Sequence, residues 1–464
     1  MGATIVFLNL PFVFFIISLS FVLYSSSLLQ EGVPGRHTPS KPRLTQFPMH
    51  HRNLSSPSFV QRSGQQLFLD GAPFYVNGWN SYWLMVQSIE DSTRPRMFAV
   101  MMAAAALGLT VCRTWAFNDA TYQALQISPG NYDENVFRAL DQVIAVAQQN
   151  GVRLLLSLVN NWEDYGGKAQ YVAWARRAGQ DVSLADDFFT NPTCRQYYKD
   201  HVTAVLTRVN TFTQVQYCND PTIFAWELMN EPECQADPSG DTLQEWIVEM
   251  AAHVKSLDQN HLLTVGTEGF YAKSNGKLEI NPNSYASTLG TDFIRNHMAP
   301  GIDFATVHAY PDTWLSSQDP SEELQFLHKW VLAHIQHSAE ILNQPVIFTE
   351  FGLSDQKSGF SIQLRNEFNN IVYDQVYSSA LEGGAAGGAL FWQFLHEEMA
   401  DWNDGFGIFP TEPCSTTELI AAQSVRLKSA SGARSTCPAI ETTNTEEEHE
   451  HNITRILKRL HLWK

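Results

Sequence analysis

The stretch FAWELMNEP, residues 224–232, and the stretch VIFTEFG, residues 346–352, decide how this chain folds. Each is a short apolar, β-rich run that ends in polar residues: Asn230 and Glu231 close the first, and Glu350 closes the second. In a parallel barrel the carboxyl ends of the strands meet at one face, and that face carries the active site. The two stretches therefore predict two glutamates brought together at one end of a sheet.

Outward from these stretches, strand-like and helix-like segments alternate along the chain. Longer amphipathic stretches separate the strand candidates, as in Arg94–Leu107, Asn135–Gln149, Arg195–Val209, Thr242–Ser256, Glu322–Ile341 and Ile362–Ser379. The strand candidates are Phe74–Gly78, Thr110–Thr114, Val152–Val159, Ile223–Leu228, Leu262–Val265, Phe304–Ala309, Val346–Glu350 and Gly388–Trp392. Strict alternation implies parallel βαβ units. We predict an α/β fold, a (β/α)8 TIM barrel, because a doubly wound sheet would carry a Gly-rich phosphate turn that this sequence lacks.

A β-hairpin precedes the barrel in this interpretation. The segment LFLDGAPFYVNG, residues 67–78, places Asp70-Gly71 between two alternating apolar runs. An Asp-Gly pair in that setting is the strongest short-range hairpin signal. We expect this short N-terminal hairpin to plug the bottom of the barrel.

The two ends of the chain differ in composition from the barrel. Residues 1–29 contain an uncharged apolar run followed by serines and are expected to be a signal peptide, with a retained signal anchor as the minority alternative. Residues 30–63 are expected to be a flexible linker or pro-region, residues 64–430 the catalytic domain, and residues 431–464 a solvated C-terminal tail. Export is the working expectation, and the acceptor patterns at Asn53 and Asn452 agree with it.

Charge and cysteine usage narrow the class of ligand. A formal charge of -18 and a pI near 5.2 argue against a nucleic-acid surface. The six cysteines permit disulfides in an exported protein, with the pairing left open, and Cys112 is expected to be a buried free thiol. No Cys or His spacing typical of a metal site is present, so we expect no metal and no cofactor.

Two strand-end glutamates match the needs of glycosidic bond hydrolysis. One carboxyl protonates the leaving oxygen, and a second attacks or stabilises the anomeric carbon. At a separation of about 5 to 5.5 Å the outcome is retention of configuration. A lone glutamate is usually a solvated surface charge, but the paired strand-end setting favours Glu231 and Glu350 as catalytic residues.

With these residues in view, the chain resembles the plant endo-β-1,4-mannanases of glycoside hydrolase family five. The resemblance spans about Gln65 to Leu427 and is carried by RTWAFND, LVNNWEDYGGKAQY, WELMNEP, GTDFIRNH, DFATVHAYPDTW, FTEFG and LFWQF. It implies that Glu231 is the acid/base and Glu350 the nucleophile of an endo-acting, retaining mannanase. Further implied functions are cleavage of mannan, galactomannan and glucomannan of the plant cell wall, and transfer to an acceptor sugar.

The same resemblance implies the substrate-binding residues. They are Arg113 beside the nucleophile, Asn230 as a donor to the sugar 2-hydroxyl, His308 and Tyr310 as an HxY pair, Trp392 as the floor of the cleavage subsite, and Trp115 as a wall of the cleft. Aromatic faces stack on pyranose rings, which suits a polysaccharide groove. For His308, a merely core-packed ring is the alternative.

Other functions stay open at this level. A β-1,4-glucanase of the same barrel clan would need the same chemistry, and a non-catalytic polysaccharide-binding protein would need only the groove. An intracellular barrel enzyme for phosphorylated metabolites is disfavoured by the leader. We expect a secreted monomer in the cell wall, with a mannan-type polysaccharide as partner, and neither nucleic acid nor membrane partners for the mature chain.

Overall fold

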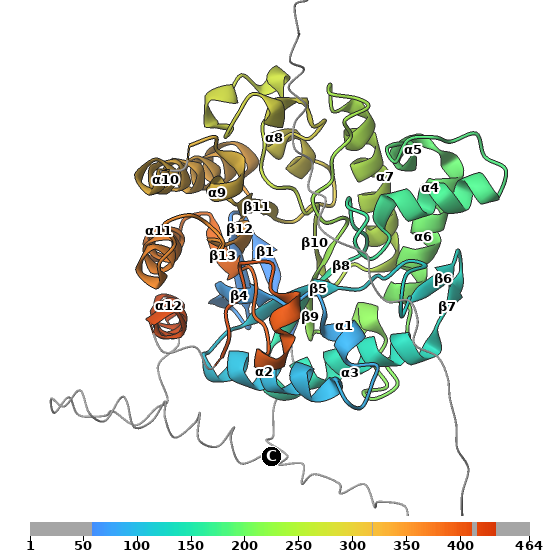
Figure 1. Cartoon of the computed structure of the whole chain (residues 1–464), viewed down its shortest axis with the longest axis horizontal. Helices are drawn as coiled ribbons and strands as arrows, with labels where there is room; N and C mark the ends of the chain where they lie inside the picture. Colours follow the sequence, from blue (N-terminus) through green and yellow to red (C-terminus); the bar gives the residue numbers. More distant parts are fainter. Residues whose placement is uncertain (1–57, 318, 411–414, 433–464) are drawn as a thin grey trace, which may run out of the picture. The chain divides into compact units, whose positions relative to one another are not determined.

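The computed structural model describes residues 58–317, 319–410 and 415–432, and its centre is a parallel barrel (Figure 1). The sheet has the order β10-β9-β8-β5-β4-β13-β12-β11. Its strands are β4 (Val76–Asn80), β5 (Val111–Trp115), β8 (Arg153–Ser157), β9 (Ile223–Glu227), β10 (Leu262–Thr264), β11 (Ala305–Ala309), β12 (Val346–Phe351) and β13 (Ala386–Phe391). The two outer strands are joined because Asp303 N donates to Leu263 O over 2.8 Å and His308 N donates to Glu268 O over 2.9 Å. The predicted (β/α)8 fold is confirmed.

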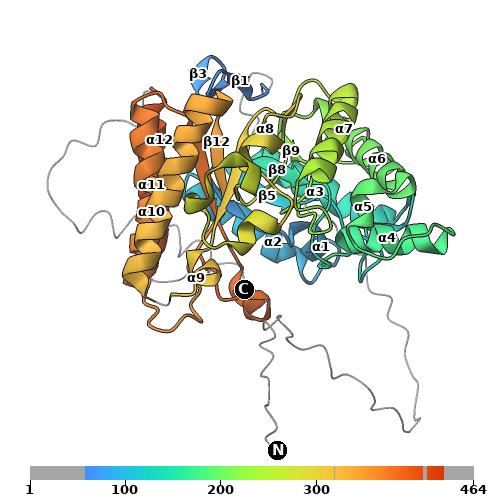
Figure 2. The ribbon, with the colours of Figure 1, turned by 90° about the horizontal axis from the view of Figure 1, so that it is seen from above.

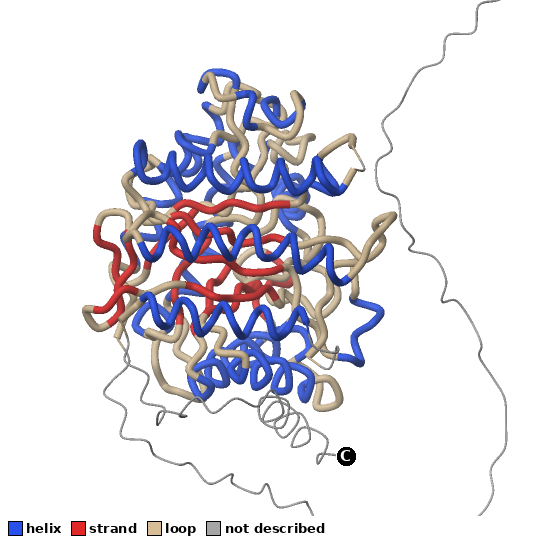
Figure 3. Tube along the Cα trace, turned by 90° about the vertical axis from the view of Figure 1, so that its left-hand side faces the viewer, coloured by secondary structure: helices blue, strands red, loops and turns tan. Residues whose placement is uncertain are grey.

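The interior of the barrel is filled by side chains from every strand or its immediate start. This inner cluster contains Val60, Leu67, Val76, Val111, Leu155, Phe224, Ala225, Leu262, Phe304, Ile347 and Leu390. A larger apolar cluster lies between the strands and the helices. Because the strands are covered on both faces, they read in the sequence as nearly continuous apolar runs. Figure 3 shows the strands enclosed by helices.

The helices connect successive strands and form the outer layer. They are α1 (Leu84–Gln87), α2 (Arg94–Ala106), α3 (Glu134–Asn150), α4 (Gly167–Arg177), α5 (Asp187–Thr190), α6 (Pro192–Leu206), α7 (Asp241–Leu257), α8 (Phe293–His297), α9 (Pro311–Trp314), α10 (Pro320–His337), α11 (Ile362–Leu381) and α12 (Ser415–Ala430). A small two-stranded sheet outside the barrel consists of β6 (Gln126–Ser128) and β7 (Asn131–Tyr132).

Local sequence signals explain where the predicted helices begin and end. In α3 the Asp133 carboxylate accepts from the backbone N–H of Asn135, and Gly151 ends the helix with φ +70°. An N-cap acid and a left-handed glycine are the usual boundary signals. The six predicted helices are present with ends shifted by a few residues, whereas α4 and α12 were not predicted. The helix α4 starts after Gly166 and within a Gly-Gly pair, a composition typical of loops.

The predicted hairpin is present at one end of the barrel. It joins β2 (Gln66–Leu69) to β3 (Ala72–Pro73), and its turn residues Asp70 and Gly71 have φ of +52° and +79°. Both values fit a type I′ turn, which explains the Asp-Gly pair. Figure 2 shows β1 and β3 at the end of the barrel opposite α9. Leu67 packs into the inner cluster, so the hairpin closes this end.

The first strand begins earlier than the sequence suggested. The strand β1 (Gln61–Ser63) pairs with β2, although these residues belong to the segment expected to be a linker. The polar sequence QRS has no apolar periodicity, but its backbone completes the small sheet while Val60 is buried in the inner cluster. The expected signal peptide, the two glycosylation patterns and the tail beyond Gly432 lie outside the described residues.

The cysteines and helices of the described part bear on two further expectations. Cys112 is buried and free, as predicted, and Cys194, Cys218 and Cys234 are free as well. Cys414 and Cys437 lie outside the described residues. Among the described residues, no helix combines the length and the apolar composition that crossing a membrane requires.

Candidate active site

The residues singled out in the sequence converge at the carboxyl ends of the barrel strands. They come from five different strand ends or the residues that follow them: Arg113 and Trp115 on β5, Asn230 and Glu231 after β9, His308 and Tyr310 on or after β11, Glu350 on β12, and Trp392 after β13. This is the end at which barrels of this class carry their chemistry. Contacts among these side chains define the site.

Arg113 is the centre of the charged network. Its Nη1 lies 2.5 Å from Glu350 Oε1, and its Nη2 donates to Glu227 Oε1 over 2.7 Å and to Asn230 Oδ1 over 2.6 Å. Arg113 is fully buried. Although burial opposes its charge, the carboxylates of Glu227 and Glu350 raise the pKa of Arg113. A guanidinium in this place is a permanent cation that orients Glu350.

Glu231 is held by two hydrogen bonds, one from strand β11 and one from the loop after β8. His308 Nδ1 lies 2.6 Å from its Oε1, and Trp162 Nε1 donates to its Oε2 over 2.6 Å. The backbone of Glu231 has φ of +50°, a sparsely populated conformation for a non-glycine residue that is often found at functional sites. Although burial alone would raise it, the hydrogen bonds and the positive charge of His308 lower the pKa of Glu231.

Glu350 lies beside Glu231 and has partners of its own. Tyr310 donates its hydroxyl to Glu350 Oε2 over 2.7 Å, and His308 Nδ1 lies 3.6 Å from the same oxygen. One oxygen of Glu350 and one of Glu231 lie within 4.8 Å of each other. Burial and the Glu231 carboxylate raise the pKa of Glu350, whereas His308 and Arg113 oppose this effect.

The two carboxyl groups do not titrate independently, because the charge of Glu231 raises the pKa of Glu350. The lowering of the pKa of Glu231 depends in part on a positive charge on His308. With a neutral imidazole, Nδ1 still donates a hydrogen bond, but the permanent cation in contact with the pair is then Arg113, at Glu350. We therefore assign the negative charge to Glu350 and the proton to Glu231 when His308 is neutral.

His308 is not simply a packed core residue. Its side chain is completely buried, yet its Nδ1 faces both carboxylates rather than apolar neighbours. Nδ1 of His308 and one oxygen each of Glu231 and Glu350 are also close enough together to hold a metal ion. The Arg113 cation already occupies one side of Glu350.

Asn230 is fixed on both sides of its amide group. Its Oδ1 accepts from Arg113, and its Nδ2 donates to Asn160 Oδ1 over 2.9 Å. An amide nitrogen carries two hydrogens. One donor therefore remains for a ligand, in a position set by its neighbours.

Aromatic rings form a continuous wall beside the carboxylates. Trp392 stacks on Tyr82 with ring centroids 5.5 Å apart and an interplanar angle of 7°, and its Nε1 donates to Asp404 Oδ2 over 2.6 Å. Trp115 lies with its centroid 6.4 Å from that of Trp392 but is only 4% exposed. Trp115 thus supports this wall from behind more than it presents a face to a ligand.

Two residues of the site were missed in the sequence. Glu227 is buried and forms the second ion pair of Arg113, and Trp162, 42% exposed, donates to Glu231. The strand-end position of Glu227 in FAWE was a usable signal, since a charge that ends a buried strand needs a partner. Trp162 gave no such signal, because a tryptophan in a loop can equally belong to the core.

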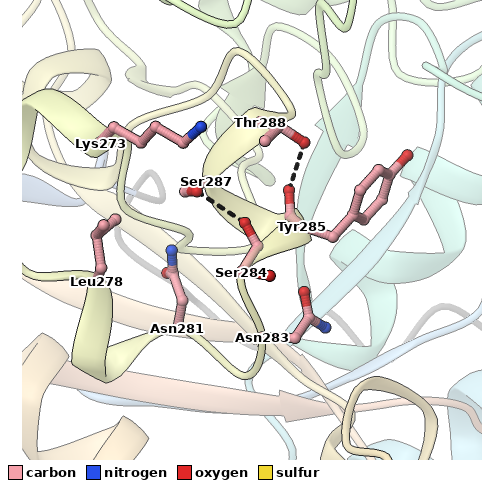
Figure 4. A pocket seen from close by; sticks show the side chains of 8 residues that line it. All are labelled: Lys273, Leu278, Asn281, Asn283, Ser284, Tyr285, Ser287 and Thr288. Carbon is pink, nitrogen blue, oxygen red and sulfur yellow. Dashed lines mark hydrogen bonds between the residues drawn. The ribbon is translucent and has the colours of Figure 1, made fainter.

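A separate cleft lies on the loop after β10 and has a volume of about 620 Å3. Figure 4 shows its lining, in which Ser287 Oγ donates to Ser284 O and Thr288 Oγ1 donates to Tyr285 O. Asn281 likewise uses its amide to hold the backbone of Tyr271. These polar groups stabilise their own loop, so we assign this cleft no part in the site.

Comparison with known proteins places this geometry in a family. Residues 57–401 match the family described as GH family 5 beta-mannosidase-like. Mannan endo-1,4-beta-mannosidase 2 of Oryza sativa subsp. japonica is 54% identical over 373 residues, which cover 80% of this chain and 84% of that protein. Mannan endo-1,4-beta-mannosidase 2 of Arabidopsis thaliana is 53% identical over 377 residues, covering 81% and 87%. The endo-beta-1,4-mannanase structure from Thermotoga petrophila superposes with a TM-score of 0.67 at 31% identity, covering 76% of this chain and 77% of that one.

Proposed function

The chain belongs to the GH family 5 beta-mannosidase-like family, and from this membership we propose that it hydrolyses internal β-1,4-mannosidic bonds of mannan, galactomannan and glucomannan. It is a glycosidase, an endo-1,4-β-mannanase that acts through two carboxyl groups. The observation that carries this proposal is the Glu231–Glu350 pair at the barrel mouth with Arg113 in contact with only one of them. This asymmetric contact supports different catalytic roles for the two glutamates.

In the proposed mechanism Glu350 is the nucleophile. Arg113 and the Tyr310 hydroxyl stabilise its negative charge and direct its oxygens toward the anomeric carbon. Attack forms a covalent glycosyl ester while the bond to the leaving oxygen breaks. The short distance between the two carboxylates supports retention, since inverting enzymes separate them by about 6.5 to 9.5 Å.

Glu231 acts as the acid and then as the base. Its proton passes to the leaving oxygen in the first step, and the resulting carboxylate is stabilised by hydrogen bonds from His308 and Trp162. In the second step Glu231 takes a proton from water, whose oxygen attacks the anomeric carbon and displaces Glu350. An acceptor sugar hydroxyl in place of that water gives transglycosylation.

The remaining residues hold the sugar in the reacting position. Trp392 supplies the aromatic floor of the cleavage subsite, with Trp115 behind it, and Asn230 offers its free amide hydrogen to the 2-hydroxyl. A cleft of about 500 Å3 extends from Trp162 on the acid/base side and suits the leaving half of a long chain. These features favour an endo-acting enzyme.

The proposal also concerns the processing, localisation and oligomeric state of the protein. The composition of residues 1–29 favours cleavage of a signal peptide and secretion to the cell wall, with N-glycosylation at Asn53 or Asn452. We expect the mature enzyme to be a monomer whose catalytic domain ends near residue 430 and whose tail, residues 431–464, is solvated. Its partner is the polysaccharide itself.

The test is a side-by-side assay of reducing-end release from galactomannan, glucomannan and carboxymethyl cellulose. The proposal expects cleavage of both mannans and little release from cellulose, with activity lost in Glu350→Gln. Equal or greater activity on cellulose would instead support a β-1,4-glucanase. Binding without release on every substrate would support a non-catalytic polysaccharide-binding protein.

A further inference from the structure

Two more carboxyl groups lie beside Glu231 and have no part in the mechanism above. Glu233 follows two residues later in the loop after β9, and Glu268 lies in the loop after β10; they are 5% and 4% exposed. Their side chains are within hydrogen-bond contact of each other. Oε2 of Glu268 is buried without a hydrogen-bond partner among the described residues.

The positive charges near this pair are already engaged. Lys168 of α4 donates to the backbone oxygen of Glu233 over 2.8 Å, but its ammonium group is ion-paired with Asp186 over 2.6 Å. On the other side, Arg113 of β5 is paired with Glu227 and Glu350, and His308 of β11 faces Glu231 and Glu350. The carboxyl groups of Glu231, Glu233 and Glu268 therefore share a region in which the nearby positive charges are already paired with other carboxylates.

Two buried carboxylates in contact cannot both be ionised at low cost, so one retains a proton. Two carboxyl groups can hydrogen-bond to each other only if one of them carries a proton. Burial, together with the charge on Glu231, raises the pKa of Glu233 to about 7 and raises the pKa of Glu268 well above its ordinary value. The charges of the pair and of Glu231 act on each other.

We propose that Glu233 and Glu268 are positioning residues that share a proton, and that the single negative charge this pair carries after losing its first proton keeps the acid/base Glu231 protonated. The backbone supports such coupling, since Glu231 N donates to Gly266 O over 2.9 Å, two residues before Glu268. His308, which holds Glu231, also donates its backbone N–H to Glu268 O. The effect on catalysis rests on the proposed role of Glu231; the shared proton does not.

The shared proton is tested by thermal unfolding of the full chain against pH. An acid whose pKa is raised in the folded state binds more protons folded than unfolded, so stability falls as pH rises from about 4.5 to 7. The double variant Glu233→Gln with Glu268→Gln keeps side chains of the same shape, which can hydrogen-bond through their amides. Because amides do not titrate, this variant does not lose stability in this way as the pH rises. Its Tm relative to wild type should therefore rise by about 2 °C or more between pH 4.5 and 7.5. A constant difference across this range would overturn the proposal.

The action on Glu231 is tested by the pH profile of kcat/KM on galactomannan. Without the negative charge of the pair Glu231 ionises more easily, so the alkaline limb of the double variant should move to lower pH by about 0.5 unit or more. An unmoved limb, or a shift to higher pH, would contradict the coupling. Glu245→Gln is the control, because this carboxyl lies on the outer helix α7, is exposed and screened by solvent, and does not line the cleft beside Trp162.

If the double variant does not fold, the single variant Glu233→Gln tests the same proposal. Glu233→Gln alone ends the repulsion between two carboxylates, so Glu268 titrates closer to its ordinary range and the fall of Tm with pH becomes smaller than in wild type. An unchanged fall would count against the shared proton. Because the Tm comparison needs no substrate, it stands even if the chain proves inactive on mannan.

Discussion

The indole Nε1 of Trp162 donates a hydrogen bond to Oε2 of Glu231 over 2.6 Å, across two neighbouring loops of the barrel. Trp162 follows β8, whereas Glu231 follows β9. The bond favours the carboxylate form of Glu231, which is the form that must develop when the leaving group takes its proton. In the proposed mechanism Trp162 therefore acts on the acid/base Glu231 through its indole nitrogen.

Trp162→Phe removes this donor and keeps an aromatic ring. Since the hydrogen bond lowers the pKa of Glu231, its loss should raise that pKa. The alkaline limb of the bell-shaped kcat/KM profile, which reports loss of the acid proton, should then move to higher pH. Trp174→Phe on the outer helix α4 should leave the limb in place. The same shift in both variants, or none in Trp162→Phe, would argue against a direct effect of Trp162.

Arg113→Lys should impair both activity and folding. Lysine cannot make the paired contacts of the guanidinium with Glu227, Asn230 and Glu350, so buried carboxylates lose partners. We expect a fall in kcat/KM of about 100-fold and a loss of unfolding free energy of about 3 kcal/mol, measured in denaturant. Arg195→Lys, at the partly exposed pair with Glu249, should cost less than about 1 kcal/mol. Near-wild-type values for Arg113→Lys would refute its central role.

Asn230→Ala should lower kcat more than it raises KM. The proposed bond from the free amide hydrogen to the 2-hydroxyl strengthens in the transition state, so its loss affects the chemical step. Steady-state kinetics on a defined manno-oligosaccharide measures the two constants separately. An unchanged kcat with only a raised KM would mean that Asn230 contributes uniform binding.

Most of the fold could be predicted because the strands of a barrel are covered on both faces. Val346–Phe351 and Ile223–Glu227 therefore stand out as short apolar runs, and Asp70-Gly71 identifies its turn through the φ values it tolerates. Strand β1 could not be predicted, because QRS pairs through its backbone and leaves no apolar pattern.

In the site, the sequence predicts which side chains reach the barrel mouth but only some of the contacts among them. The resemblance implied that Arg113 lies beside Glu350, but nothing in the sequence identified the buried Glu227 as its second partner. Glu233 and Glu268 are 35 residues apart and lie in two different loops, so no local sequence pattern predicts their contact. For Trp115 the resemblance implied a wall of the cleft, whereas the structure buries its side chain.

Azide rescue of the two glutamate variants tests the assignment of their roles most directly. With an activated aryl β-mannoside and azide, Glu350→Ala should yield the α-mannosyl azide, because azide attacks in place of the nucleophile with one inversion. Glu231→Ala should still form the glycosyl ester on Glu350 and release the β-azide after two inversions. Product anomers are read by NMR. The account predicts opposite anomers from the two variants; the same anomer from both, or near-wild-type turnover by Glu350→Ala, would contradict it.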